Sequence, residues 1–312
     1  VAKLEQTEER VARLNLVLRA IRNVNQLIVR EKDRDRLIQS ACEHLTEARG
    51  YDSTWIAIFD ASGEVMTTAQ SGLDESFAPL LAQLRRNELP ACGQQALDQA
   101  EMVVIAEPAT ACTDCPLAAN YEGALTVRLA HGEQVYGLLA VSIPVNLVGD
   151  IEEQALLREV AGDIAFALHD IELETARAQA EAALRESHEK FQHLFEHLPI
   201  GLSLTAPTGE VQANRAFYEM LGYSQHHDSL TWQEITHPDD VEESQAVIEA
   251  LMAGEKARAR FIKRYVHKDG AIVWAEVSTA ARQDEDGRTR YFMTAVQDIT
   301  ERKRAAAALR ES

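Results

Sequence analysis

The spacing of apolar residues points first to a long helix near the middle of the chain. Residues 164–198 contain no Gly or Pro and are rich in Ala, Leu, Glu and Arg, which favour helix. Apolar or small side chains recur there about every seven residues, which predicts one helix, or two nearly coaxial ones, joining two globular domains. This seam consists of Ile164, Leu168, Ile171, Thr175, Ala178, Leu184, Phe191 and Leu198. Because its middle has few large apolar residues, we expect it to pair with a second copy; a solvated connector is the alternative.

A second stretch with this period opens the chain. Leu4, Val11 and Leu18 lie seven residues apart, and Asn25 continues the series. The pattern predicts a coiled-coil helix over residues 1–30, in which an Asn on the seam fixes the register of a dimer. We therefore expect a homodimer that associates through its helices.

Shorter apolar or alternating runs predict strands, and these fall into two groups on either side of the central helix. The first group covers 53–60, 64–70, 102–105, 125–130 and 135–143; the second covers 201–205, 211–213, 260–267, 271–281 and 290–298. Turn residues separate the runs within each group. Two groups of strands predict two domains, which a chain of 312 residues also favours.

Charge narrows the range of partners. The chain has 31 Lys and Arg against 50 Asp and Glu, a net charge of −19, which argues against nucleic acid or an anionic membrane as a partner. No apolar run approaches the length of a membrane span, and Pro144 interrupts the best candidate, residues 136–148. No secretory signal opens the sequence. We expect this segment to be cytoplasmic and to contain no membrane-spanning part.

The strand pattern of the first domain, with two of its sequences, resembles a GAF domain over about residues 30–170. These sequences are the hairpin strand VYGLLAVSI at 135–143 and the closing helix EEQALLREVAGDIAFAL at 152–168. The resemblance implies a six-stranded antiparallel sheet between helices, with a ligand pocket on one face. The chain has neither the Asn-Lys-Phe-Asp-Glu motif of cyclic-nucleotide GAF domains nor the Cys-His pair that anchors bilins.

All four cysteines lie in this first domain, and a reducing compartment favours metal or redox chemistry over structural disulfides. Cys112 and Cys115 form a C-x2-C pair that can present two thiolates to one metal ion. We expect Cys92, Cys112 and Cys115, together with Cys42, to face one another across the GAF pocket and to hold zinc or an iron–sulfur cluster. Two alternatives stay open: a dithiol–disulfide switch of Cys112 and Cys115, or inert thiols, since a Cys on an apolar helix face such as Cys42 usually packs in a core.

The second domain resembles a PAS domain of the S-box kind over about residues 188–300. The motifs that carry the resemblance are Gly209-Glu210-Val211, Ala213-Asn214-Arg215-Ala216-Phe217, Leu221-Gly222-Tyr223, His237-Pro238-Asp239-Asp240, Asp269-Gly270 and Asp298-Ile299-Thr300-Glu301-Arg302-Lys303. The resemblance implies a five-stranded antiparallel sheet with helices around a pocket. This half has no cysteine, which excludes a thiol adduct with flavin. Its aromatic residues are expected to fill the core, and the ligand of its pocket is open.

These resemblances together predict an α+β fold with two antiparallel-sheet sensor domains strung on long coiled-coil-like helices. The expected layout is an N-terminal helix at 1–30, a GAF domain at 31–165, a connector helix at 166–190, a PAS domain at 191–300 and the start of an output helix at 301–312. The sequence AALRES occurs at 182–187 and again at 307–312, so a further domain is expected beyond it.

The resemblance implies the sensory and relay part of a bacterial signal-transduction protein. A sensor histidine kinase of a two-component system is the expected full-length protein. A diguanylate cyclase and a ligand-free dimerisation scaffold are the alternatives. No phosphate-cradling Gly loop and no nucleophile triad stand in the sequence, so we expect no catalytic residues and no turnover in this segment.

Overall fold

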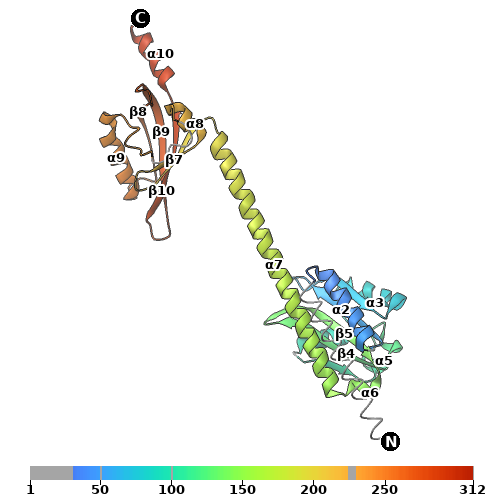
Figure 1. Cartoon of the computed structure of the whole chain (residues 1–312). Helices are drawn as coiled ribbons and strands as arrows, with labels where there is room; N and C mark the ends of the chain where they lie inside the picture. Colours follow the sequence, from blue (N-terminus) through green and yellow to red (C-terminus); the bar gives the residue numbers. More distant parts are fainter. Residues whose placement is uncertain (1–30, 50, 100, 224–229, 312) are drawn as a thin grey trace. The chain divides into compact units, whose positions relative to one another are not determined.

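The structure is a computed structural model that describes residues 31–49, 51–99, 101–223 and 230–311. The coiled-coil helix predicted for residues 1–30 lies outside this part of the chain. The chain divides into two compact units between Ala180 and Glu181, and each is described by itself (Figure 1).

The first unit is built on an antiparallel sheet with the strand order β2-β1-β5-β4-β3. Its strands are β1 (Ser53–Phe59), β2 (Val65–Ser71), β3 (Val103–Ile105), β4 (Gly123–His131) and β5 (Gln134–Ile143). The resemblance implied six strands, whereas the described residues of this unit form five. Between β2 and β3, α3 (Phe77–Leu84) buries Phe77, Leu80 and Leu84 at helical spacing.

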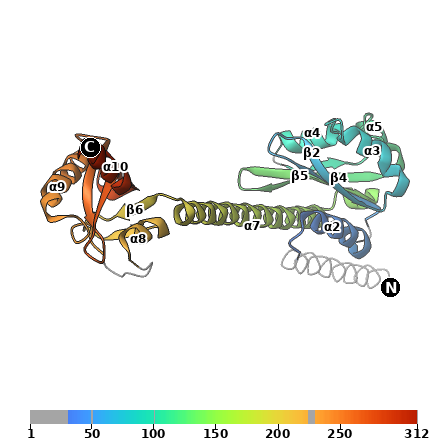
Figure 2. The same ribbon diagram turned by 90° about the horizontal axis from the view of Figure 1, so that it is seen from above.

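The two faces of this sheet are covered by different helices (Figure 2). Alternate residues of β1 point to opposite faces, so Ile56 and Trp55 belong to separate apolar clusters. The Ile56 face packs against α2 (Arg34–Arg49) and the first third of α7 (Ile151–His197). The other face packs against α3, α4 (Ala91–Asp98) and the segment around α5 (Pro108–Ala111). The remaining short elements are η1 (Asp74–Ser76), η2 (Ala118–Asn120) and α6 (Val145–Val148).

The long central helix is present as the sequence predicted, and α7 runs unbroken from Ile151 to His197. The predicted seam is wrong at its beginning, however. Ile164 and Leu168 are buried in the core of the first unit, so they are not available to a second helix. Further along, Leu184 and Phe191 of the same predicted seam are exposed. The same seven-residue spacing therefore places side chains in the core of the first unit near the start of α7, and on exposed surface further along the helix.

The second unit has the five-stranded antiparallel sheet that the PAS resemblance implied, in the order β7-β6-β10-β9-β8. Its strands are β6 (Gly201–Thr205), β7 (Val211–Ala213), β8 (Arg258–Val266), β9 (Ile272–Gln283) and β10 (Thr289–Asp298). Its helices are α8 (Arg215–Leu221), α9 (Pro238–Met252), which lies along the sheet in Figure 1, and α10 (Thr300–Glu311). The core consists of aromatic and aliphatic residues from α8, the strands and the segment before α9.

One motif residue, Asn214, joins three parts of this unit. Its side chain is fully buried and accepts hydrogen bonds from the backbone N–H groups of Leu202 and Phe217, at 2.8 and 3.0 Å. Its amide donates to the carbonyl oxygens of Phe195 and Ile200. The bond to Phe217 caps α8, and the other bonds hold the end of α7 and the start of β6 against it.

No helix in the described ranges combines the length and the apolar character that crossing a membrane requires.

Candidate sensory pockets

A small cavity of about 40 Å³ lies in the first unit, on the face of the sheet that α4 and α5 cover. Three of the four predicted cysteines, Cys92, Cys112 and Cys115, line it together with Trp55 and Tyr121. Its remaining wall is mainly aliphatic side chains and inward-facing residues of β4 and β5. We refer to Cys92, Cys112 and Cys115 as the thiol group.

Two chain segments bring the thiol group together. Cys92 lies in the first turn of α4, directly after Pro90 and Ala91. The carboxylate of Asp114, between the other two cysteines, accepts a hydrogen bond of 2.9 Å from the backbone N–H of Ala91. This bond ties the start of α4 to the loop that carries Cys112 and Cys115. Cys92, Cys112 and Cys115 therefore share one pocket, as expected for these three residues from the sequence.

None of the three cysteines of the thiol group forms a disulfide. Burial, followed by the neighbouring Cys92 and Cys115 thiols, raises the pKa of Cys112 to about 12. Burial likewise raises the pKa of Cys115. Both groups are therefore protonated near neutral pH, and each must lose a proton before it can bind a metal or attack a disulfide.

Cys42 does not belong to this group. It lies on α2 among Leu37, Ile38 and Leu45, has no exposed surface and packs against the opposite face of the sheet. Burial raises the pKa of its thiol. The structure therefore does not support the expectation that Cys42 shares the pocket, because the whole sheet separates it from the thiol group. Its position is that of a core residue, as its apolar helix face also indicated.

A four-cysteine metal site does not fit this arrangement. Within the described residues, no group of three or more His, Cys, Asp or Glu side chains is placed to hold a metal ion. Structural zinc sites and iron–sulfur clusters commonly take four protein ligands. With Cys42 on the other face, the chain offers three thiols at this pocket. Three thiols at one pocket also suit oxidation of a thiol pair or contact with a small ligand.

A second cavity, of about 50 Å³, lies in the second unit between the sheet and α9. Apolar side chains supply part of its wall, among them Phe217, Ile248 and Phe292. The polar part of the wall consists of Ser203, Thr205, Ser244, Lys263, Thr279 and Thr294. The aromatic residues Phe217, Tyr218 and Trp232 are buried in the core, as the sequence led us to expect. The lysine and the serine and threonine hydroxyl groups of the pocket wall were not expected.

Lys263 is the charged residue of this wall that sequence reasoning missed. It is only 7% exposed, and its ammonium donates a hydrogen bond of 2.9 Å to the hydroxyl of Thr236. The Nζ atom lies 4.4 Å from the ring centre of Tyr265 and 5.7 Å from that of Trp232. A signal was present in β8, because Phe261, Lys263 and Tyr265 alternate and must share one face of the strand.

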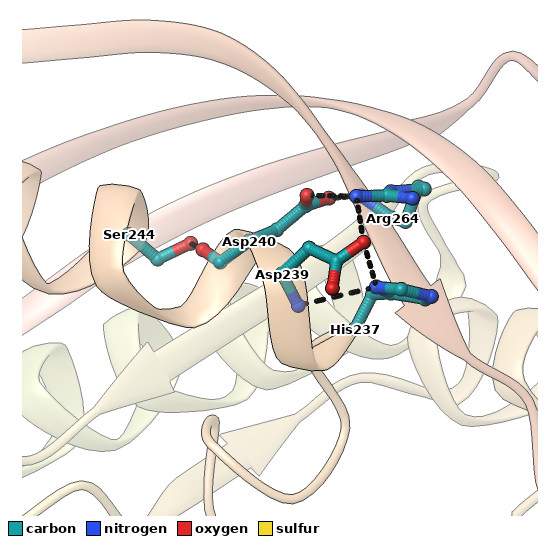
Figure 3. Close-up of polar contacts among 5 residues, drawn as sticks. All are labelled: His237, Asp239, Asp240, Ser244 and Arg264. Carbon is teal, nitrogen blue, oxygen red and sulfur yellow. Dashed lines mark hydrogen bonds and ion pairs between the residues drawn. The ribbon is translucent and has the colours of Figure 1, made fainter.

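The His237-Pro238-Asp239-Asp240 motif serves a structural purpose, and three of its residues make polar contacts at the start of α9 (Figure 3). His237 caps α9 and accepts from the backbone N–H of Asp239. The Asp240 carboxylate accepts hydrogen bonds from the backbone N–H and the guanidinium of Arg264 on β8, at 2.7 and 3.0 Å through one oxygen. These bonds hold the pKa of Asp240 below its usual value. They fasten the first turn of α9 to the sheet and so close one side of the pocket.

Each of the two sheet domains has a small pocket of its own. Comparison with protein families assigns both domains. The family model described as GAF domain matches residues 31–169, and the model described as PAS fold matches residues 210–296. The chain therefore carries a GAF domain followed by a PAS domain, as its motifs predicted.

Two curated relatives match parts of the chain. The probable diguanylate cyclase DgcE of Escherichia coli strain K12 is 34% identical over 123 residues, which are 39% of this chain and 11% of that protein. The uncharacterised protein y4lL of Sinorhizobium fredii is 30% identical over 151 residues, 48% of this chain and 18% of that protein. The matched stretches thus span less than a fifth of either relative.

Solved structures also resemble part of the chain. A sensory box histidine kinase/response regulator from Burkholderia thailandensis is 24% identical, with a TM-score of 0.33, over 39% of this chain and 92% of that structure. A PAS domain from Colwellia psychrerythraea is 22% identical, with a TM-score of 0.34, over 36% of this chain and 97% of that structure. The domain assignment rests on the family models and on the sheet topology, not on these scores.

Proposed function

We propose that this chain is the sensory and relay part of a bacterial signal-transduction protein that works as a dimer. The observation that carries the proposal is the succession of two sensor domains, each with its own pocket, along a chain in which α7 continues unbroken from one unit into the next. An event in a pocket alters the sheet around it, and the helices that enter and leave the sheet pass the change on.

The relay is tested by changing the length of α7 in a full-length protein that contains this chain. Residues 172–190 are all exposed, so deletions there remove no core contact. Deleting residues 179–180 rotates the C-terminal part of α7 by about 160° relative to its N-terminal part, whereas deleting residues 176–182 rotates it by only about 20°. We expect the two-residue deletion to change output activity strongly and the seven-residue deletion to leave it near the wild-type level. Equal activity from both deletions would contradict a helical relay.

Two catalytic activities are candidates for the output of the full-length protein, and a separate observation supports each. The resemblance of the domain order to sensor histidine kinases favours autophosphorylation. The 34% identity to a probable diguanylate cyclase favours synthesis of a cyclic dinucleotide from GTP. The full-length protein should be incubated with labelled ATP and, separately, with GTP. A labelled protein supports the kinase, and a cyclic dinucleotide product supports the cyclase.

Redox sensing by the GAF domain is a second candidate role, favoured by the three thiols that share one pocket. Oxidation of two of these thiols to a disulfide releases two protons and passes two electrons to an oxidant such as peroxide. Peptide mass mapping after mild oxidation should show a disulfide within the thiol group in the wild type, formed through Cys112. It should persist in a Cys42→Ser control, because Cys42 lies across the sheet. A chain whose three thiols stay reduced would support the inert alternative.

A further inference from the structure

The PAS domain contains a buried lysine, Lys263, whose ammonium group has fewer hydrogen-bond partners than donors. Among the described residues, Lys263 has one hydrogen bond, to Thr236, and no carboxylate within ion-pair distance. Burial lowers the pKa of Lys263 to about 8, so the group is still mainly protonated at neutral pH. An ammonium has three N–H donors, and a buried charge is costly unless it is paired.

The nearest acidic group is already engaged. Asp240 raises the pKa of Lys263 through its charge, but its carboxylate oxygens accept hydrogen bonds from Arg264. The rings of Tyr265 and Trp232 contact Nζ through their faces and supply no carboxylate to pair with its charge. The position of Lys263 therefore leaves donor capacity directed toward the cavity that it lines.

The sheet wall of the same cavity is polar in a way that suits an anion. Ser203, Thr205, Thr279 and Thr294 are each buried and point inward from three neighbouring strands. The Thr294 hydroxyl donates to that of Thr279 at 2.9 Å, which leaves the Thr279 hydroxyl a proton to donate elsewhere. Hydroxyl donors beside an ammonium favour a carboxylate ligand, because ionised acceptors form the stronger hydrogen bonds.

We propose that the PAS pocket binds a small organic carboxylate, with its anionic group held by Nζ of Lys263 and its apolar part against the facing side chains of Phe217, Ile248 and Phe292. The cavity of about 50 Å³ sets the size, since it holds a short-chain acid and little more. A cationic ligand is disfavoured by the ammonium. This proposal rests on the sensory function proposed above and gives that function a ligand class.

Titration of the whole chain with simple acids tests the proposal even though the natural ligand is unidentified. The probes are acetate, propionate and butyrate, each compared with its neutral amide and with propylamine. Binding is followed by NMR shifts of the amide groups of β8, β9 and β10. We expect the acids to shift these signals saturably, while the amides bind at least about tenfold more weakly and propylamine does not bind.

Two variants assign the effect to the lysine. Lys263→Met keeps the apolar stem and removes the charge, so it should weaken propionate binding at least about tenfold. Lys268→Met, an exposed lysine of the same domain, should bind as the wild type does. Equal binding of acid and amide by the wild type, a comparison that needs no variant, would overturn the proposal. So would undiminished binding by a folded Lys263→Met chain.

The outcome is separable from that of the relay. If the wild type does not bind the carboxylates but responds to the α7 deletions as expected, the ligand class is rejected and the sensory function is kept. If it binds them but the deletions have no effect, the ligand class is supported and the helical relay is rejected.

Discussion

At the residue scale, Asp240 and Arg264 show how a family motif is used here. Asp240 is 16% exposed and holds Arg264 through both backbone and side chain, whereas Asp239 is 70% exposed and adds one bond of 3.2 Å. The two neighbouring acids therefore contribute unequally. One fastens α9 to β8, and the other lies mostly in solvent.

Asp240→Asn should destabilise the PAS domain by about 1–3 kcal/mol at neutral pH, because it removes an ionised acceptor from a largely buried hydrogen-bond set. Asp239→Asn, the matched control, should cost less than about 1 kcal/mol. Hydrogen exchange of α9 and β8 amides in the whole chain measures both. The folded pKa of Asp240 lies below its unfolded value of about 4, so its contribution is complete above that pH and is lost as pH falls further. A pH-independent difference between wild type and Asp240→Asn would contradict this account.

Lys263 predicts a pH dependence of the same sign as that of Asp240, but in a higher pH range. Its folded pKa of about 8 lies below the unfolded value of about 10.4, so the unfolded state binds more protons between these values. Without ligand, the stability of the PAS domain should therefore rise with pH above about 8. Burial raises the pKa of Tyr265, which works against this rise above about pH 10.

Lys263→Met should stabilise the ligand-free PAS domain by about 1–3 kcal/mol at neutral pH, since an incompletely paired buried charge is replaced by an apolar side chain. It should also abolish the rise in stability above about pH 8. Chemical denaturation from about pH 7 to 9.5 measures both effects, with Lys268→Met as the exposed control. Loss of stability in Lys263→Met at neutral pH would mean that the charge is better satisfied than its described contacts indicate.

At the scale of elements, α7 has two kinds of apolar residue. Leu157, Val160, Ile164 and Leu168 belong to the GAF core, while Phe166, Leu173, Leu184 and Phe191 are more than half exposed. The exposed four succeed one another by 7, 11 and 7 residues, steps that return to nearly the same face of a helix. We name these four the exposed stripe. It is the part of α7 that we propose pairs with a second copy.

Leu184→Asp and Phe191→Asp should each weaken dimerisation at least about tenfold, because each places a charge within an apolar contact. Ala182→Asp adds the same charge on the opposite face of α7 and should leave association unchanged. Sedimentation or light scattering at tens of micromolar measures the result. A wild-type chain that is already monomeric, or equal effects of all three substitutions, would contradict the pairing.

At the scale of the whole molecule, the two families matched within the chain are the GAF and PAS sensory domains. We predict that the 312 residues alone give neither a phosphorylated protein with ATP nor a cyclic dinucleotide with GTP. Radiolabel transfer and chromatography of the nucleotide products check this. Turnover by the purified chain would mean that one of the two pockets is catalytic.

The sequence by itself determined the elements, since the features that specify them are local. The absence of Gly and Pro from residues 164–198, together with a helical period, specified the greater part of α7, and the alternation of β8 and β9 specified a sheet. Family motifs such as Asn214 and Gly222 lie at helix ends where their chemistry is required. Asn214 caps α8, and Gly222 ends it at φ 76°, where a Cβ would meet the ring of His267 at 2.3 Å.

Only the tertiary structure decided which faces those elements share. Cys42 and Cys92 both lie on amphipathic helices, and nothing local says that α2 and α4 cover opposite sides of one sheet. The burial of Ile164 and Leu168 likewise depends on the GAF core that α7 meets. The alternation of β8 placed Lys263 on the same face as its neighbours Phe261 and Tyr265, but its burial depends on α9 closing over that face, through Asp240 and Arg264. Local periodicity fixes two faces for each element, and long-range packing selects what each face touches.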